Sequence, residues 1–221
     1  MKISDGALYI TQGFTIAVSE LPPVNRAPVI TPIPSLTAIA GVVFTYDVDA
    51  TDPDGDILVY SLATTYTDMI INSTTGVISW IPTIVGNFTV IVQVSDGELS
   101  DTQSFTITVI AGEAAKLLWV DDPVSPATSG EPWYPAFSIE ITDGFGNRTL
   151  DIHEITIITT GTEGTITAGE TAVAEAGLAT FGAFTYTLTV TTVPDTITII
   201  GKSATLTDTP ASNEVTIPTT G

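Results

Sequence analysis

Alternating apolar and polar residues mark several extended segments of the chain. Every second residue is apolar in 88–95, and residues 105–109 repeat the pattern. Residues 137–142 and 184–191 alternate in the same way, with Thr at every polar position of the last segment. Because side chains point to opposite faces of a strand in turn, this period of two predicts half-buried antiparallel strands. One face of each strand is expected to pack in a core, and the other face to carry Thr, Ser or other residues.

Turn residues separate these segments at intervals typical of a β-sandwich. Residues 52–55 read Asp-Pro-Asp-Gly, residues 96–97 read Asp-Gly, and residues 145–147 read Phe-Gly-Asn. Apolar residues at helical spacing are not found, and 111–116 is the only helix-friendly run. With 221 residues, the chain is long enough for two domains of about 100 residues each. The pattern predicts an all-β chain of two tandem antiparallel β-sandwiches.

One segment of the sequence occurs twice. Residues 4–18 read SDGALYITQGFTIAV and residues 95–109 read SDGELSDTQSFTITV, with 10 of 15 positions identical at an offset of 91 residues. A period near 90 residues is the size of one small sandwich domain. Residues 1–20 are therefore expected to be the last strand of a preceding module. The alternative is a strand donated to a neighbouring subunit by strand addition.

The repeat also divides the rest of the chain. After its second copy the pattern changes and no third copy follows, so residues 25–110 and 114–217 are expected to be modules of different types. The first linker, 20–27, contains the pair Pro22-Pro23 and should be stiff. The second linker is expected at 111–115.

Charge and composition exclude several classes of function. Five Lys and Arg face 25 acidic residues, a formal net charge of −20, which disfavours binding to nucleic acid and to anionic membranes. Cys is absent and His153 is the only histidine, so thiolate or histidine zinc sites and Ser-His catalysis have almost no residues to use. The N-terminus lacks a signal-type apolar region, and any signal or anchor is expected outside this chain. We expect no enzymatic activity.

An acidic loop is the strongest candidate for a metal site. Five aspartates lie between residues 47 and 56, and in a turn their side chains would converge: Asp47, Asp49, Asp52, Asp54 and Asp56. Carboxylate oxygens at alternating positions suit Ca²⁺, which takes six to eight oxygen ligands. The spacing is not that of an EF-hand, because Gly55 is in the fourth position and Ala63 replaces the bidentate Glu. The alternative is that Asp-Pro-Asp-Gly is only a type I turn.

Six motifs in order make residues 25–110 resemble the cadherin-like domains of the dystroglycan type, also called putative Ig domains in prokaryotic surface proteins. This resemblance implies an immunoglobulin-like sandwich and Ca²⁺ ligands at Asn25, Asp52, Asp54, Asp56 and Asp96, with Asp5 from the adjoining module end. The motifs are NRAP at 25–28, ATDPDGD at 50–56, LVYSL at 58–62, TGVISWIP at 75–82, GNF at 86–88 and VSDG at 94–97.

Residues 114–217 resemble the Ig-like repeats of invasin and intimin type adhesins. The similarity rests on PAF at 135–137 leading to ITDGFGN at 141–147, and on AGLATF at 176–181. Both resemblances imply tandem immunoglobulin-like antiparallel β-sandwiches. They also imply an extracellular structural or adhesive module of a prokaryotic cell-surface protein, such as an adhesin stalk, surface layer or filament, stiffened by Ca²⁺.

Other features bear on partners. The expected partners are neighbouring modules or subunits of a surface assembly, and glycans. Sequons at Asn72, Asn87 and Asn147 are candidate glycosylation sites, although short sequons are common by chance in a Thr-rich chain.

The aromatic residues Trp119, Trp133 and Tyr134 could form a sugar-stacking platform. We expect them instead to close the end of a sandwich or to cement a module interface. The platform would fit the alternative function, a carbohydrate-binding or spacer module of a secreted polysaccharide-active enzyme.

Overall fold

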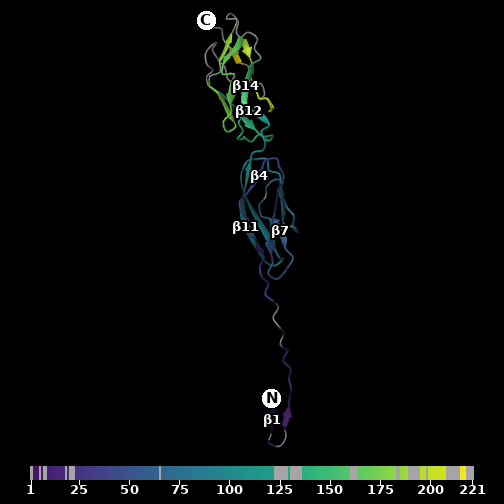
Figure 1. The fold of residues 1–221 in the computed structure, drawn as a ribbon. Helices are drawn as coiled ribbons and strands as arrows, with labels where there is room; N and C mark the ends of the chain where they lie inside the picture. Colours follow the sequence, from purple (N-terminus) through teal and green to yellow (C-terminus); the bar gives the residue numbers. More distant parts are fainter. Residues whose placement is uncertain are drawn as a thin grey trace.

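The chain is built from strands and loops. The computed structural model describes residues 2–4, 6, 9–17, 19, 23–64, 66–121, 129, 136–159, 164–182, 185–188, 195–197, 199–207 and 215–217. Within these ranges there is no helix, and so none that is long and apolar enough to cross a membrane. Two β bodies follow one another along an elongated molecule, and the N-terminal segment extends away from the first (Figure 1). The prediction of an all-β chain of tandem sandwiches is confirmed.

The first module contains two main sheets and a short pair. In the larger sheet, β4 runs parallel to β11, and the long β10–β11 hairpin and β7 are antiparallel to their neighbours. The larger sheet has the order β4 (Leu36–Ile39), β11 (Ser100–Ile110), β10 (Gly86–Ser95), β7 (Val59–Leu62). The second sheet has the order β5 (Phe44–Asp47), β9 (Val77–Trp80), β8 (Ile70–Ile71), and the short pair is β3 (Val29–Ile30) with β6 (Ala50–Thr51).

The core of the first module follows the predicted alternation. Val90, Val92 and Val94 of β10 are fully buried, and the residues between them, Ile91 and Gln93, are half-buried. On β11, Ile107 is also fully buried. Ile78 of the opposite sheet is buried in the same cluster. Since burying one such side chain contributes about 1.5–3 kcal/mol, this core stabilises the hairpin that carries part of the candidate site.

The second module has its own set of antiparallel strands. They form two three-stranded sheets and two pairs. The sheets are β12 (Lys116–Asp121), β13 (Phe137–Thr142), β17 (Leu178–Phe181) and β16 (Thr171–Val173), β14 (Glu154–Thr159), β20 (Ile199–Lys202). The pairs are β15 (Gly164–Ala168) with β18 (Thr185–Leu188), and β19 (Asp195–Ile197) with β21 (Val215–Ile217).

Aromatic packing organises the core of the second module. The rings of Phe137 and Phe181 stack at 5.3 Å, and Trp119 meets Phe137 edge-on at 5.7 Å. Trp119 therefore packs on the sandwich core, which agrees with a residue that closes a sandwich, and its place at a module interface stays a prediction. Trp133 and Tyr134 lie outside the described residues. The prediction of a polar outer face also fails in β13, where Ser138 and Thr142 are buried, because this central strand is flanked by β12 and β17.

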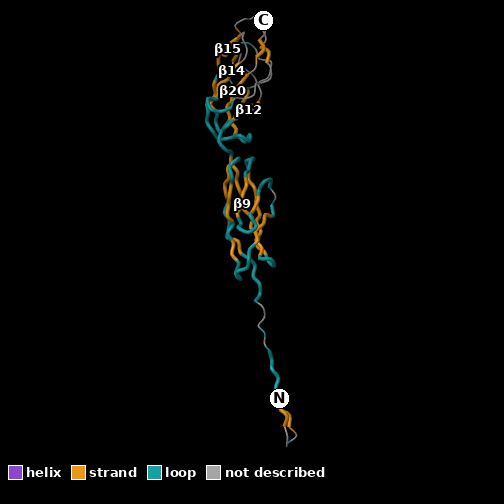
Figure 2. The backbone as a smooth tube through the Cα atoms, turned by 90° about the vertical axis from the view of Figure 1, so that its right-hand side faces the viewer, coloured by secondary structure: helices purple, strands orange, loops and turns teal. Residues whose placement is uncertain are grey.

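The N-terminal segment forms a small hairpin of its own. β1 (Lys2–Ser4) pairs antiparallel with β2 (Tyr9–Thr11). Residues 12–17, 19 and 23–28 lie outside any strand, and both views show the hairpin away from the sandwiches (Figure 2).

Candidate metal centre and module joint

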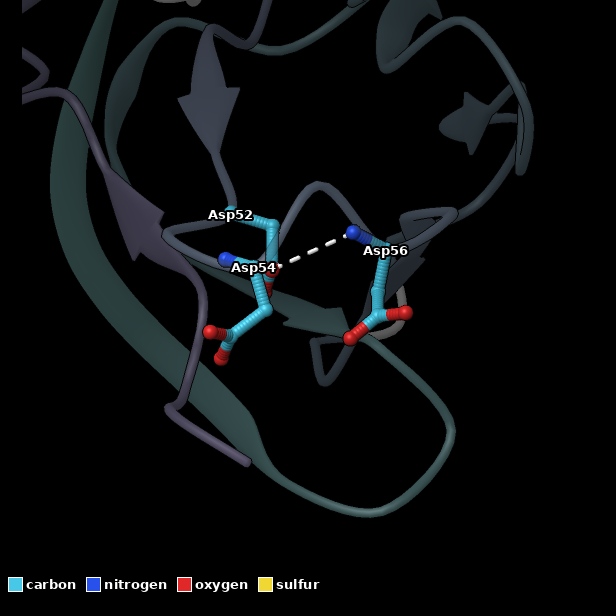
Figure 3. Close-up of side chains that lie close together, drawn as sticks. All are labelled: Asp52, Asp54 and Asp56. Atoms are coloured by element: carbon cyan, nitrogen blue, oxygen red, sulfur yellow. Dashed lines mark hydrogen bonds between the residues drawn. The ribbon is translucent and has the colours of Figure 1, made fainter. Parts of the chain in front are cut away.

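The acidic loop between β6 and β7 is folded by one of its own aspartates. Oδ1 of Asp52 accepts hydrogen bonds from the backbone N–H groups of Asp54 at 2.8 Å and Asp56 at 3.2 Å. Gly55 has a φ of +83°, a conformation that glycine adopts without strain. The turn places ligand atoms of all three carboxylates within 4.8 Å of one another (Figure 3). Three like charges this close repel one another, which favours a neutralising cation.

One of these carboxylates already has a cationic partner. The Arg26 guanidinium lies 2.6 Å from Oδ1 of Asp54, and the Arg26 backbone N–H donates to Oδ2 of Asp54 at 2.8 Å. The side-chain hydrogen bond from Arg26, followed by its backbone hydrogen bond, lowers the pKa of Asp54. Both oxygens of Asp54 are thus occupied by Arg26, a residue that the sequence analysis did not place near the site.

Two further predicted ligands come together from the first linker and the β10–β11 turn. Oδ1 of Asp96 accepts hydrogen bonds from the backbone N–H groups of Leu99 and Glu98 at 2.6 and 2.7 Å. These bonds, the one from Leu99 first, lower the pKa of Asp96. Oδ2 of Asp96 accepts from Nδ2 of Asn25 at 3.1 Å, which joins the linker to the turn. Glu98 adds a carboxylate that the sequence analysis missed, 3.5 Å from the same Asn25 nitrogen.

These groups surround one open depression of about 640 Å³. It is lined by Pro23, Val24, Asn25, Asp54, Asp56, Asp96 and Glu98. Oδ2 of Asp52 and Oδ1 of Asn25 are buried and have no hydrogen-bond donor among the described residues. Leaving a buried acceptor unsatisfied costs about 1–3 kcal/mol. Hard oxygen atoms of this kind are the ligands that Ca²⁺ prefers, so the residues fit the cation.

Two of the aspartates in the predicted cluster lie apart from it. Asp49 accepts a hydrogen bond from the Thr31 hydroxyl at 2.9 Å, and Asp47 lies on the exposed face of β5. The prediction that all five side chains converge is therefore wrong, because β5 and β6 carry the first two away from the turn. Asp5 lies outside the described residues.

A second polar cluster joins the two modules. The Asn147 side chain donates from Nδ2 to the Thr83 carbonyl at 2.9 Å and accepts from the Val85 N–H at 3.2 Å. Nδ2 also donates to Oδ2 of Asp143 at 2.9 Å. Asn147 thus links the turn after β13 to the loop between β9 and β10 of the first module.

Asp143 holds this joint from the second module. It is 1% exposed and accepts hydrogen bonds from the backbone N–H groups of Gly112, Phe145 and Asn147. Burial acts to raise its pKa, but the hydrogen bonds from Asn147 and Gly112 outweigh burial and lower it. The ring of Phe145 lies where a Cβ of Gly41 would stand, so the glycine leaves room for contact between the modules.

The three sequon asparagines have different surroundings. Oδ1 of Asn72 accepts from the backbone N–H groups of Thr74 and Thr75, and Oδ1 of Asn87 accepts from the Thr108 hydroxyl. At Asn147, both of the Nδ2 donors are used in the joint. Glycosylation at the three sites stays a prediction.

The geometry defines a tandem array of β-sandwich modules with an acidic depression at one end of the first module. Residues 27–110 match the family described as "Putative Ig domain". The first module is therefore an Ig-like domain, which agrees with the resemblance found in the sequence. The similarity of residues 114–217 to invasin and intimin repeats stays a prediction. No curated protein matches the chain.

Solved structures show a similar fold. A structure of mouse cadherin-23 EC22-24 is similar with a TM-score of 0.55 and 13% identity, covering 88% of this chain and 64% of that chain. Human protocadherin-24 EC1-2 has a TM-score of 0.47 and 12% identity over 89% and 100%. An endo-fucoidan hydrolase of glycoside hydrolase family 107 has a TM-score of 0.38 and 20% identity over 88% of this chain. This chain spans only 29% of that hydrolase. At these identities the cadherin-23 likeness concerns the fold alone.

Proposed function

We propose that this chain is an extracellular structural or adhesive segment of a surface protein and that Ca²⁺ stiffens the N-terminal end of its first module. The observation that carries the proposal is the acidic depression together with two buried, donor-free oxygens: one of Asn25, which lines the depression, and one of Asp52, whose carboxylate lies beside those of Asp54 and Asp56. A simple turn gives no reason for these two oxygens to be buried without hydrogen-bond donors. A cation there would satisfy both and reduce the repulsion among the carboxylates.

Several segments of this chain would supply ligands to such a site. Asp52 and Asn25 would supply the buried oxygens, Asp96 a half-buried carboxylate, and Asp56 and Glu98 exposed carboxylates. These groups come from the first linker, the acidic loop and the β10–β11 turn. The bound cation would neutralise the clustered charge, while the side chains fix the linker against two loops. The consequence is a stiffer connection at this end of the module.

The module joint supports a mechanical role at the other end. Asn147 and Asp143 hold the two sandwiches end to end through hydrogen bonds to backbone groups of the first module and the linker. A chain with stiffened ends acts as a spacer, and Ig-like domains are common in such proteins. The net charge of −20 disfavours nucleic acid and anionic membranes as partners. Partners of the spacer are neighbouring modules or subunits of a surface assembly.

A catalytic role and a carbohydrate-binding role have less support. The Ig-like family match is typical of non-catalytic modules. The likeness to the fucoidan hydrolase has a TM-score of 0.38 and carries no argument. Of the three aromatic residues considered for sugar stacking, Trp119 is committed to the core of the second module.

Titration calorimetry with Ca²⁺ tests the proposed site. We expect one site in the wild-type chain, lost in Asp52→Asn and weakened in Asp96→Asn. Asp68→Asn is a matched control. Asp68 is exposed and lines a different depression of the same module, together with Thr83 at the joint end. It should bind Ca²⁺ as the wild type does. No heat of binding in the wild type, or equal loss in the control, would contradict the proposal.

A further inference from the structure

The N-terminal hairpin has the same strand register as the end of the first module. Shifting each β1–β2 residue pair by the 91-residue offset gives a pair of the β10–β11 hairpin. Lys2↔Thr11, Ile3↔Ile10 and Ser4↔Tyr9 correspond to Gln93↔Thr102, Val94↔Asp101 and Ser95↔Ser100. The sequence repeat is therefore also a structural repeat in the two paired strands of each hairpin.

The described glycine between the two strands of each hairpin also has a similar φ. Gly6 has a φ of +100° and Gly97 a φ of +104°. Both values lie in the region that favours glycine. Residues 2–4 and 9–11 thus pair as at a module end without the rest of a module around them.

The two copies differ in what covers their apolar residues. Phe105 and Ile107 are 5% and 0% exposed, whereas their counterparts Phe14 and Ile16 are 74% and 73% exposed. In the first module, Ile107 pairs with Phe88 on one side and Leu36 on the other. Residues 12–17 carry the side chains for such a core but contact no sheet in the described part of the chain. Exposed large apolar residues in a row mark an interaction surface.

We propose that residues 2–18 are the terminal hairpin of another sandwich of the same type as residues 25–110. Its partner is an open Ig-like sandwich that lacks this hairpin and buries Phe14 and Ile16 in its core. The first module of a second copy is not such a partner, because its own β10–β11 hairpin already pairs with β4 and β7.

Replacing the second copy with the first within the intact chain tests whether the N-terminal hairpin can complete a sandwich. Residues 93–109 are replaced by residues 2–18, which places Phe14 and Ile16 at the positions of Phe105 and Ile107. We expect the first module to keep a cooperative thermal transition. The same replacement carrying Phe14→Asp should lose it, because the aspartate would be buried in the core. Loss of the transition in the replacement without Phe14→Asp would overturn the proposal.

A chimera tests the partner. Residues 25–92 are fused before Lys2 of the full chain, which joins Val92 directly to Lys2 as the 91-residue offset requires. Hydrogen exchange of residues 9–17 should then slow on the order of a hundredfold or more, since core strands of a folded sandwich open only rarely. Unchanged exchange in the chimera would contradict the proposal.

The unmodified chain distinguishes an open sandwich from a second copy as the partner. Hydrogen exchange of residues 9–17 should stay fast at all protein concentrations, because an isolated two-stranded hairpin is at best marginally stable. Protection that grows with concentration would identify a second copy as the partner and would overturn the proposal. This test is independent of Ca²⁺ binding, so its failure leaves the proposed metal site untouched.

Discussion

Asn147→Ala is expected to loosen the joint between the two modules. The substitution removes the hydrogen bonds to Thr83 and Val85, with lengths of 2.9 and 3.2 Å. At about 0.5–1.5 kcal/mol each, their loss should weaken the joint by roughly 1–2 kcal/mol after partial replacement by water. One or two kcal/mol changes a two-state population by a factor of about 5–30. Asp143 loses one donor but keeps those from the backbone, so the second module should stay folded.

Residual dipolar couplings measure this effect directly. In the wild type, one alignment tensor should describe both modules, because a rigid joint orients them together. In Asn147→Ala, the modules should need separate tensors. Asn87→Ala is the matched control, since the Asn87 side chain bonds only within its own module, to Thr108. A single tensor in Asn147→Ala, or separate tensors already in the wild type, would refute the reasoning.

Three further predictions follow from the core, the acidic loop and the joint. Ile107→Ala should lower the free energy of unfolding of the first module by about 2–5 kcal/mol, because Ile107 is fully buried, and a loss below about 1 kcal/mol in urea unfolding would contradict this packing. Arg26→Gln should tighten Ca²⁺ binding in calorimetry, because it removes the guanidinium from Oδ1 of Asp54 while Oδ2 keeps the backbone N–H of residue 26, and weaker binding would show that Arg26 does not compete with the cation. The folded pKa of Asp143 is lowered, so its contribution is present above the unfolded value near 4 and lost as pH falls through the folded value. The stability advantage of wild type over Asp143→Asn should therefore begin to shrink as the pH falls below about 4 and vanish once the pH is below the folded pKa, and an advantage that does not shrink in acid would count against the joint.

The buried positions of the core strands could be predicted from the alternation of apolar and polar residues, because these strands follow it closely. Val90, Val92 and Val94 are buried where the period of two places them. The 91-residue repeat predicted a last strand in residues 1–20, but it did not predict that residues 2–4 pair with residues 9–11 as a hairpin. Patterns that depend on neighbouring residues can be read from sequence, because the physics that produces them is local.

Contacts between distant segments were not predictable in the same way. Arg26 reaches Asp54 across 28 residues, and Asn147 reaches Thr83 across 64. Each contact depends on where whole strands place the intervening loops, which no local pattern encodes. The burial of Thr142 in β13 has the same origin, because a central strand is covered on faces that alternation alone would assign to solvent.

Differential scanning calorimetry with Ca²⁺ and with excess chelator tests the central claim most directly. A cation that binds only the folded state stabilises it by about 2.7 kcal/mol when its concentration is a hundred times the dissociation constant. All the proposed ligands lie in residues 25–98 of the first module. The account predicts that Ca²⁺ raises the transition of the first module alone, and that Asp52→Asn abolishes the shift. Identical transitions with Ca²⁺ and chelator, or an equal shift in Asp52→Asn, would contradict it.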